Sequence, residues 1–293
     1  MLVIDNILKM KLKSIISIIK TSFSHWQNHR ASRMGAALSY YAIFSIVPLL
    51  MLALVVIGPI SGDEYIQTAI VEQVHTLINA QSANFIQSLL IALSQIKFNF
   101  FTIIISIGTL IFGALGVFYE LKNSIDDLWD TKQSVKEIKS WKYFFSSRLL
   151  SLSMIPIFGF LLIISLVFSG LISFISGYSP VFARITYLYQ VGSFIFSFFV
   201  LSFLFTFIYR FLPKRKLPWN ELIRGALITT VLFMIGKSVL SLTITQLAGA
   251  SIFGATEAFV VLLLWVYYSV QIFLFGASLT YVYSRRYGHL KEQ

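Results

Sequence analysis

A lysine in the middle of an apolar run is the residue of this chain best suited to chemistry. Lys237 lies within residues 223–247, which carry only one other charge, at position 224. A charged side chain at the centre of a membrane-spanning helix costs about 2.5–3.5 kcal/mol to insert, so it faces a bundle interior or a wet cavity. The helix face that carries it is small and polar and is predicted to point inward; its other members are Ala226, Thr230, Ser241 and Thr245.

Two interpretations of Lys237 remain open. The ammonium can bind or relay a charge, or it can be structural, bonded to helix carbonyls or reaching outward past Thr245. Glu257 is the nearest candidate counter-ion by predicted depth.

A second group of polar residues interrupts the stretch ALSYYAIFSIVPLL, residues 37–50. Pro48 cannot donate a hydrogen bond to the carbonyl of Phe44, and its ring displaces that carbonyl. Ser45 and Tyr41 lie on nearly the same helical face, so this span is predicted to be kinked with a polar inner face. One interpretation is a broken helix at a transport site; the other is a packing kink.

Gln271 is the third polar feature predicted at mid-membrane. Its position in residues 259–283 places it at about the depth of Ser45 and Lys237. We therefore predict an intramembrane cavity that binds or moves a solute or lipid, lined by Tyr41, Ser45, Pro48, Lys237 and Gln271. The rival interpretation is an envelope structural or partner-binding protein, in which these groups only hold helices together, since interhelical hydroxyls are worth about 0.6 kcal/mol each as packing contacts.

Composition defines the elements that must position these residues. The chain has 293 residues, of which 57% are hydrophobic and 12% charged, about half the charged share of a soluble domain. Apolar runs near the roughly 20 residues that cross a bilayer predict an all-α polytopic membrane protein. The six predicted spans are 36–58, 98–119, 149–175, 185–209, 223–247 and 259–283.

The basic residues predict the orientation of these spans. Of the 23 lysines and arginines, all but three lie before the first span, after the last, or at the second and fourth connections, where Arg224 at the edge of the fifth span is counted with the fourth connection. The exceptions are Lys97, Arg184 and Lys237. The positive-inside rule then places both termini in the cytoplasm. The predicted parts are a basic cytoplasmic segment 1–34, a transmembrane domain 35–284 and a cytoplasmic tail 285–293.

Amphipathic helices are predicted on both membrane faces. Residues 4–26 mix isoleucine, leucine and lysine, which favours a helix on the cytoplasmic leaflet, with a frayed basic tail as the alternative. Residues 64–97 show two apolar helical patterns. These outer-face helices either cap the bundle or pack on the bilayer surface.

The residue types give little support for a metal-dependent, phosphate-binding or hydrolytic enzyme. The chain has no cysteine, the four histidines are scattered, and no metalloprotease, phosphate-loop or hydrolase motif is present. The acidic cluster Asp126, Asp127 and Asp130 with Glu120 is interpreted as a helix end balanced by Lys122 and Lys132 rather than as a magnesium site. No catalytic residue, metal, cofactor or nucleic-acid partner is predicted; membrane lipids are the expected surroundings. The first 33 residues do not read as a cleavable signal.

Five ordered motifs resemble the YihY/BrkB family of bacterial integral membrane proteins, over roughly residues 25–285. The motifs are ALSYYAIFSIVPLL, FGALGVFYELKNSIDDLWD at 112–130, YRFLPKRKLPW at 209–219, SIFGA at 251–255 and VVLLLWVYYSVQIFLFGASLT at 260–280. Single positions that match the family pattern are Tyr40, Tyr41, Ser45, Pro48, Tyr209, Pro213, Gly225, Lys237, Gly254, Trp265, Tyr267, Gly276 and Ala277.

The resemblance implies six helices and an inner-membrane location, and it also reveals two departures. The family usually has glutamate where this chain has Ser278, and often asparagine where it has Asp126 or Asp127. If that glutamate moves protons or cations, this chain lacks the step. Some family members carry the older label ribonuclease BN, which is regarded as a misassignment, and the absence of a metal-binding cluster from the sequence agrees with that view.

Overall fold

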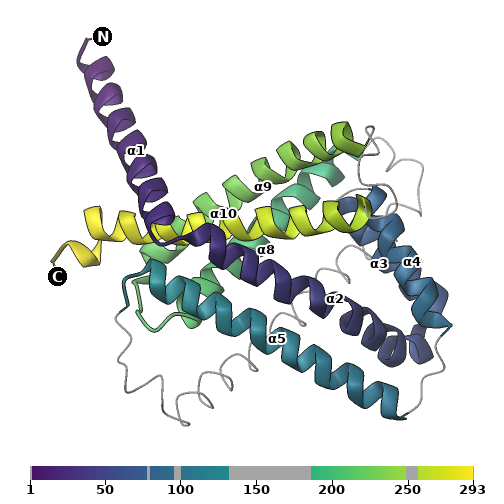
Figure 1. Ribbon diagram of the computed structural model, residues 1–293. Coiled ribbons are helices and arrows are strands. Elements are labelled where there is room, and N and C mark those ends of the chain that lie inside the picture. The colour runs from purple at the N-terminus through teal and green to yellow at the C-terminus, as the bar shows by residue number, and fades with distance from the viewer. Residues whose placement is uncertain (1, 78–79, 96–99, 132–185, 249–256, 293) are drawn as a thin grey trace, which may run out of the picture. The chain divides into compact units, whose positions relative to one another are not determined.

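The computed structural model describes residues 2–77, 80–95, 100–131, 186–248 and 257–292 (Figure 1). These residues form α-helices and one short 3₁₀ helix, with no strand among them. The helices are α1 (Leu2–Asn28), α2 (Ala31–Ser61), α3 (Asp63–Leu77), α4 (Ala80–Ser94), α5 (Phe100–Leu128), α8 (Thr186–Phe211), α9 (Trp219–Ala248) and α10 (Glu257–Tyr287), followed by the 3₁₀ helix η3 (His289–Glu292).

Five of these helices are long and apolar enough to cross a membrane. The matching segments are Ala31–Val55, Ile103–Leu128, Phe194–Phe211, Trp219–Leu240 and Phe259–Tyr287. They confirm an all-α polytopic membrane protein and correspond to five of the six predicted spans. The remaining predicted span, 149–175, lies outside the described residues. The helices extend beyond the predicted limits; α10, for example, continues past the predicted start of the tail at residue 285.

The chain divides into two compact units. The first comprises Met1–Phe23, Ile125–Val231 and Gly276–Gln293, and the second comprises Ser24–Ser124 and Leu232–Phe275. Each of α1, α5, α9 and α10 therefore contributes one end to each unit.

In the first unit, α9 packs closely on α10 through two matching glycine–threonine pairs. A β-carbon on Gly225 would overlap the side chain of Thr280, and one on Gly276 would overlap Thr229. Each threonine hydroxyl donates to the carbonyl of the glycine one turn earlier in its own helix, at 2.8 Å. Small residues let the helix backbones approach, and the hydroxyls need no partner from lipid.

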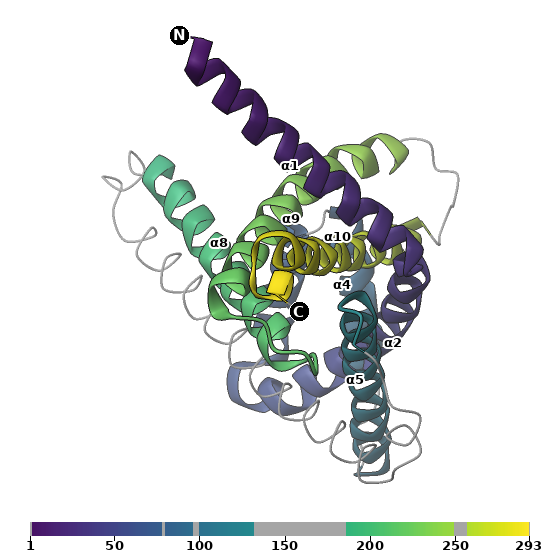
Figure 2. The same ribbon diagram turned by 90° about the vertical axis from the view of Figure 1, so that its left-hand side faces the viewer.

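The connection between α8 and α9 is also part of the first unit (Figure 2). The Arg210 guanidinium donates to the carbonyl of Leu217 at 2.8 Å and lies over the ring of Trp219. The Lys216 ammonium donates to the last carbonyls of α8, at Arg210 and Phe211. A cation at these carbonyls favourably opposes the negative end of the helix dipole and stabilises the end of α8.

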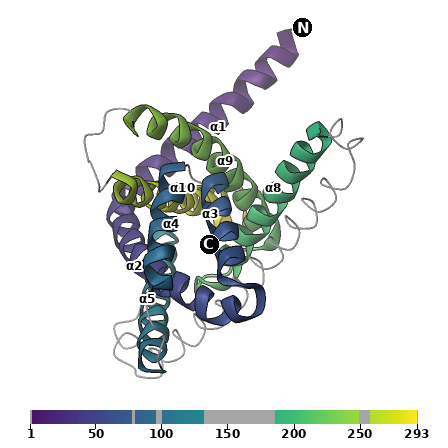
Figure 3. The same cartoon turned by 90° about the vertical axis from the view of Figure 1, so that its right-hand side faces the viewer.

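In the second unit, α3 and α4 form a helical hairpin against α2 (Figure 3). The two helices confirm the amphipathic patterns predicted in residues 64–97. Their apolar side joins a core cluster made of Leu50, Met51, Leu54, Ile86, Leu90, Leu93 and Leu262. The hairpin thus packs on α2 and on Leu262 of α10.

Candidate functional site

Tyr41 and Ser45 lie where α2 contacts α5. The Ser45 hydroxyl donates to the carbonyl of Tyr41 at 2.8 Å, within its own helix. A β-carbon on Gly113 of α5 would overlap the Ser45 hydroxyl, and one on Gly116 would overlap the Tyr41 ring. These two predicted site residues therefore fill a close helix–helix contact made possible by glycines.

Pro48 does not interrupt α2. The helix runs without a break from Ala31 to Ser61, and Pro48 is buried within it. The interpretation as a broken helix is therefore wrong. Ser45, the nearest hydroxyl, bonds to the carbonyl of Tyr41 rather than to that of Phe44, which the proline leaves without its helical donor.

Gln271 contacts the beginning of α2, far from Ser45. Its amide nitrogen donates to the carbonyl of Ser32 at 3.3 Å, and the amide fills the space over Gly35. Its buried amide oxygen has no hydrogen-bond partner among the described residues. Ser32 precedes Ser45 by three to four helical turns, or roughly 20 Å at 1.5 Å per residue. The predicted common depth of Gln271 and Ser45 is therefore wrong.

Lys237 lies in the second unit, one residue after a tight contact between α9 and α10. A β-carbon on Gly236 would overlap the side chains of Tyr268 and Ile272. The Lys237 side chain is half-buried, and no described residue forms a hydrogen bond or ion pair with its ammonium. The predicted counter-ion Glu257 begins α10, but its side chain is outside the described ones, as are those of Ser241 and Thr245.

The hydroxyls of α8 connect it to α9, as the packing interpretation predicts. Ser202 donates to the hydroxyl of Thr230 at 3.0 Å, and Tyr209 reaches the hydroxyl of Thr229 at 3.3 Å. Because Thr229 and Thr230 donate to carbonyls of their own helix, the α8 hydroxyls act as donors here. The hydroxyls of Ser202 and Tyr209 are thus used for helix packing within the first unit.

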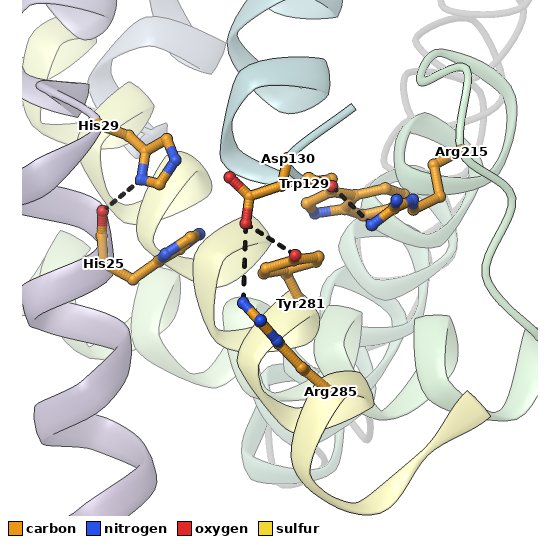
Figure 4. A network of polar contacts seen from close by, with 7 residues as sticks. All are labelled: His25, His29, Trp129, Asp130, Arg215, Tyr281 and Arg285. Atoms are coloured by element: carbon orange, nitrogen blue, oxygen red, sulfur yellow. Dashed lines mark hydrogen bonds and ion pairs between the residues drawn. The ribbon is translucent and has the colours of Figure 1, made fainter. Parts of the chain in front are cut away.

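A network at the end of α5 brings together residues from three of the motifs (Figure 4). The helix ends in a Schellman motif, in which the amide of Thr131 donates to the carbonyl of Asp126 at 2.9 Å. Asp130 has the left-handed φ of 48° that glycine usually supplies in this motif. Its carboxylate accepts a hydrogen bond from Tyr281 at 2.8 Å and lies 3.9 Å from Arg285. These contacts explain an aspartate at this position.

Trp129 and Asp126 anchor neighbouring segments to the same helix end. The indole nitrogen of Trp129 donates to the carbonyl of Ala277 at 3.1 Å, and its own carbonyl accepts from Arg215 at 3.0 Å. Asp126 is fully buried and accepts from the backbone amide of Lys214 at 2.7 Å. The acidic cluster is therefore held by the 209–219 motif and by α10, which sequence spacing alone did not indicate. The fully buried Trp129 was also missed, although its motif had been recognised.

Ser278, the departure from the family pattern, is buried in the first unit. Its hydroxyl donates to the carbonyl of Ser22 in α1 at 2.9 Å. The position at which the family usually has glutamate is thus occupied here by a short side chain that ties α1 to α10.

Two of the four histidines, which were predicted to be scattered, lie close together. His25 and His29 lie one helical turn apart in the second unit, with ring centroids separated by 4.1 Å. The Nδ1 of His29 bonds to the carbonyl of His25 at 2.8 Å (Figure 4). The four-residue spacing was the signal that could have identified this pair.

Comparisons with known proteins agree with the sequence motifs. The chain matches the family model described as Virulence factor BrkB over residues 22–293. A UPF0761 membrane protein of Actinobacillus pleuropneumoniae is 25% identical over 276 residues, covering 89% of this chain and 91% of that protein. The Bacillus subtilis protein named putative ribonuclease-like protein YfkH is 22% identical over 281 residues, covering 92% and 96%.

A stronger but shorter similarity links the chain to a UPF0761 membrane protein of Vibrio cholerae. The two are 38% identical over 84 residues, which is 28% of each chain. The match thus spans less than a third of that relative. No solved structure matches the chain.

Proposed function

Because the chain belongs to the Virulence factor BrkB family of membrane proteins, we propose that it binds an anionic solute or the anionic headgroup of a lipid at Lys237. Movement of that ligand across the membrane is the function that such a site would serve. The group that Lys237 would bind is a carboxylate or a phosphate, carried by either a soluble molecule or a lipid.

The observation that carries this proposal is the state of the Lys237 ammonium. It belongs to an apolar span, it is half-buried, and no described residue pairs with it. Placing a charge in a membrane costs about 2.5–3.5 kcal/mol on insertion scales. An anion that enters the site would offset that cost, so the lysine favours binding of a negative group.

The other polar residues that were predicted to line the cavity have a structural role in this proposal. Tyr41 and Ser45 are engaged with α5, and Gln271 with the start of α2. We assign these side chains, together with Pro48, to positioning the helices around the site. The amide oxygen of Gln271 is buried and has no hydrogen-bond partner among the described residues.

Thermal stability of the purified protein tests the proposal. Wild type, Lys237→Met and Lys237→Arg would be melted with anionic lipids, zwitterionic lipids, and soluble carboxylates and phosphates. A ligand at 100 times its Kd should stabilise the protein by about 2.7 kcal/mol. A shift that is lost in Lys237→Met and kept in Lys237→Arg is expected, and the class of compound that produces it identifies the source of the anion.

Arg224→Met is the matched control, because Arg224 is an exposed cation on the same helix. Its shift should equal that of wild type. An equal shift in Lys237→Met, or no shift with any anion, would contradict the proposal.

The packing contacts favour a second candidate, a structural or partner-binding membrane protein. The hydroxyls of Ser45, Ser202 and Thr230 all bond within the protein. This candidate requires that Lys237→Met destabilise the protein without any ligand, because the lysine would then be part of the packing.

We assign no catalytic residue, cofactor or nucleic-acid partner to this chain. The ribonuclease-like name belongs to the Bacillus subtilis relative, whereas the names of the Actinobacillus and Vibrio relatives describe membrane proteins. Incubation of the purified protein with RNA and a panel of divalent cations is expected to leave the RNA intact. Metal-dependent cleavage would overturn this assignment.

The proposed location is a bacterial inner membrane with both termini in the cytoplasm. Since the chain has no cysteine, single cysteines at exposed positions report sidedness directly. Asn220→Cys should react with a membrane-impermeant maleimide only after permeabilisation, and Ser88→Cys should react in intact spheroplasts. The reverse pattern would invert the proposed topology.

A further inference from the structure

The N-terminal helix α1 is held in a defined rotational setting by α10. Within the first unit, three serines of α1 form hydrogen bonds with three residues near the end of α10. The carbonyl of Ser22 accepts a hydrogen bond from the hydroxyl of Ser278, and the hydroxyl of Ser17 accepts one from the guanidinium of Arg286 at 2.8 Å. The hydroxyl of Ser14 forms a hydrogen bond with the hydroxyl of Tyr287. Because these contacts extend over more than two turns of α1, they determine which face of the helix points away from α10.

The face of α1 directed away from these serines is apolar and exposed. Ile16 is 57% exposed and Ile19 is 47% exposed, and Phe23 continues the same stripe at 49%. The three residues are spaced by three and four positions, so they lie on one side of the helix. An exposed apolar stripe of this kind marks a contact with a membrane or a partner.

Charge favours the membrane as the occupant. Lysines occur in the same helix at positions 9, 11, 13 and 20, against one acidic residue, Asp5. Positions 9, 13 and 20 fall beside the isoleucine stripe on a helix of 3.6 residues per turn. A helix with an apolar stripe bordered by lysines lies in the headgroup region, with its apolar side about 5–10 Å deep.

We propose that α1 lies in the surface of the leaflet on its side of the membrane, where Ile16 and Ile19 contact acyl chains and the adjacent lysines bind anionic phospholipid headgroups. The serine contacts with α10 hold the stripe toward the lipid. Each lysine near an anionic surface changes the ratio of inserted to detached helix by about fivefold. The depth of α1 therefore reports the anionic lipid content of that leaflet, and α10 is the membrane-spanning helix attached to it.

Two labelled variants of the full chain test this inference. Ile19→Cys places an environment-sensitive fluorophore on the stripe, and Thr21→Cys places it on another exposed face two residues away. Each protein would be reconstituted into phosphatidylcholine vesicles with and without phosphatidylglycerol. Nitroxide lipids quench a fluorophore that lies in the bilayer, and iodide quenches one that is exposed to the aqueous solution. Equal melting temperatures of the two variants would establish that both are folded.

The expected result is quenching of the Ile19→Cys label by nitroxide lipid, stronger with phosphatidylglycerol, and quenching of the Thr21→Cys label by iodide. Adding Lys20→Gln should reduce the effect of phosphatidylglycerol by about fivefold. A label on Ile19→Cys that remains accessible to iodide in both lipid mixtures would overturn the inference and favour a protein partner for the stripe. Equal quenching with and without phosphatidylglycerol would overturn the selectivity for anionic lipid.

Discussion

The indole nitrogen of Trp129 donates a hydrogen bond to the backbone carbonyl of Ala277 at 3.1 Å, which joins the end of α5 to α10 across 148 positions of sequence. Trp129 is fully buried, and its ring also lies 6.3 Å from that of Tyr209 in α8. One side chain thus contacts two other helices of the first unit.

Trp129→Phe should destabilise the protein by about 1–3 kcal/mol, because it removes a buried hydrogen bond and part of a packed ring. Thermal unfolding in detergent measures the loss. Trp219→Phe is the matched control, since Trp219 is 48% exposed; its change should stay within about 0.5 kcal/mol. Equal effects of the two substitutions would show that Trp129 does not hold these helices together.

The contact between α2 and α5 predicts opposite effects for two glycines of one helix. Gly113→Ala should destabilise by about 1–3 kcal/mol through overlap with Ser45. Gly108→Ala meets no atom within 4 Å and should be neutral or stabilise by up to about 1 kcal/mol, because alanine favours the helix. Both are measured by melting temperature.

Adding Ser45→Ala to Gly113→Ala should recover part of the stability, since it removes the overlapping hydroxyl. No recovery would mean that the two helices are not in contact at this point.

Lys237→Met is expected to raise the melting temperature of the ligand-free protein, because it removes a charge that no described residue pairs with. Lys122→Met is the comparison. Lys122 is buried and has interactions in the structure, so its loss should destabilise by about 1–3 kcal/mol. A destabilised Lys237→Met protein would favour the structural candidate over the binding candidate.

The C-terminal 3₁₀ helix depends on close approach to Glu221. The Glu221 carboxylate is buried and accepts a hydrogen bond from the amide of His289 at 2.7 Å, while a β-carbon on Gly288 would overlap that carboxylate. Gly288→Ala should therefore detach the tail and accelerate amide hydrogen exchange of His289 by about tenfold or more.

Glu221→Gln is the control for this prediction. It keeps an oxygen acceptor for the His289 amide, so exchange should change far less. Unchanged protection in Gly288→Ala would show that the tail is not held by this contact.

Features that depend on interactions along one helix could be predicted from the sequence. The length of an apolar run decides whether a helix can cross a membrane, and five of the predicted spans are helices in the structure. The two amphipathic patterns in residues 64–97 also correspond to α3 and α4. Side-chain spacing along one helix determines these features, so they could be predicted before any contact was known.

Predictions that required one helix to be placed against another were wrong. Gln271 and Ser45 were assigned one depth by counting residues from each span centre, yet Gln271 reaches Ser32. Counting residues from the span centres assumes that every helix is perpendicular to the membrane and centred at the same depth. The tilt and the axial shift of each helix are instead decided by its packing against neighbouring helices. The broken helix expected at Pro48 failed for a related reason, since a proline can be accommodated within a helix when its surroundings support the backbone.

By itself, the sequence determined that this protein is an all-helical membrane protein of a particular family, because hydrophobic run length and motif order are properties of the chain alone. Only the tertiary structure decided which polar residues are available for function. Within the two units, glycines at contact points let Ser45 and Tyr41 pack on α5, and the 209–219 motif bonds to the end of α5. Such pairings depend on backbone approach between segments far apart in sequence, which no spacing along one helix encodes.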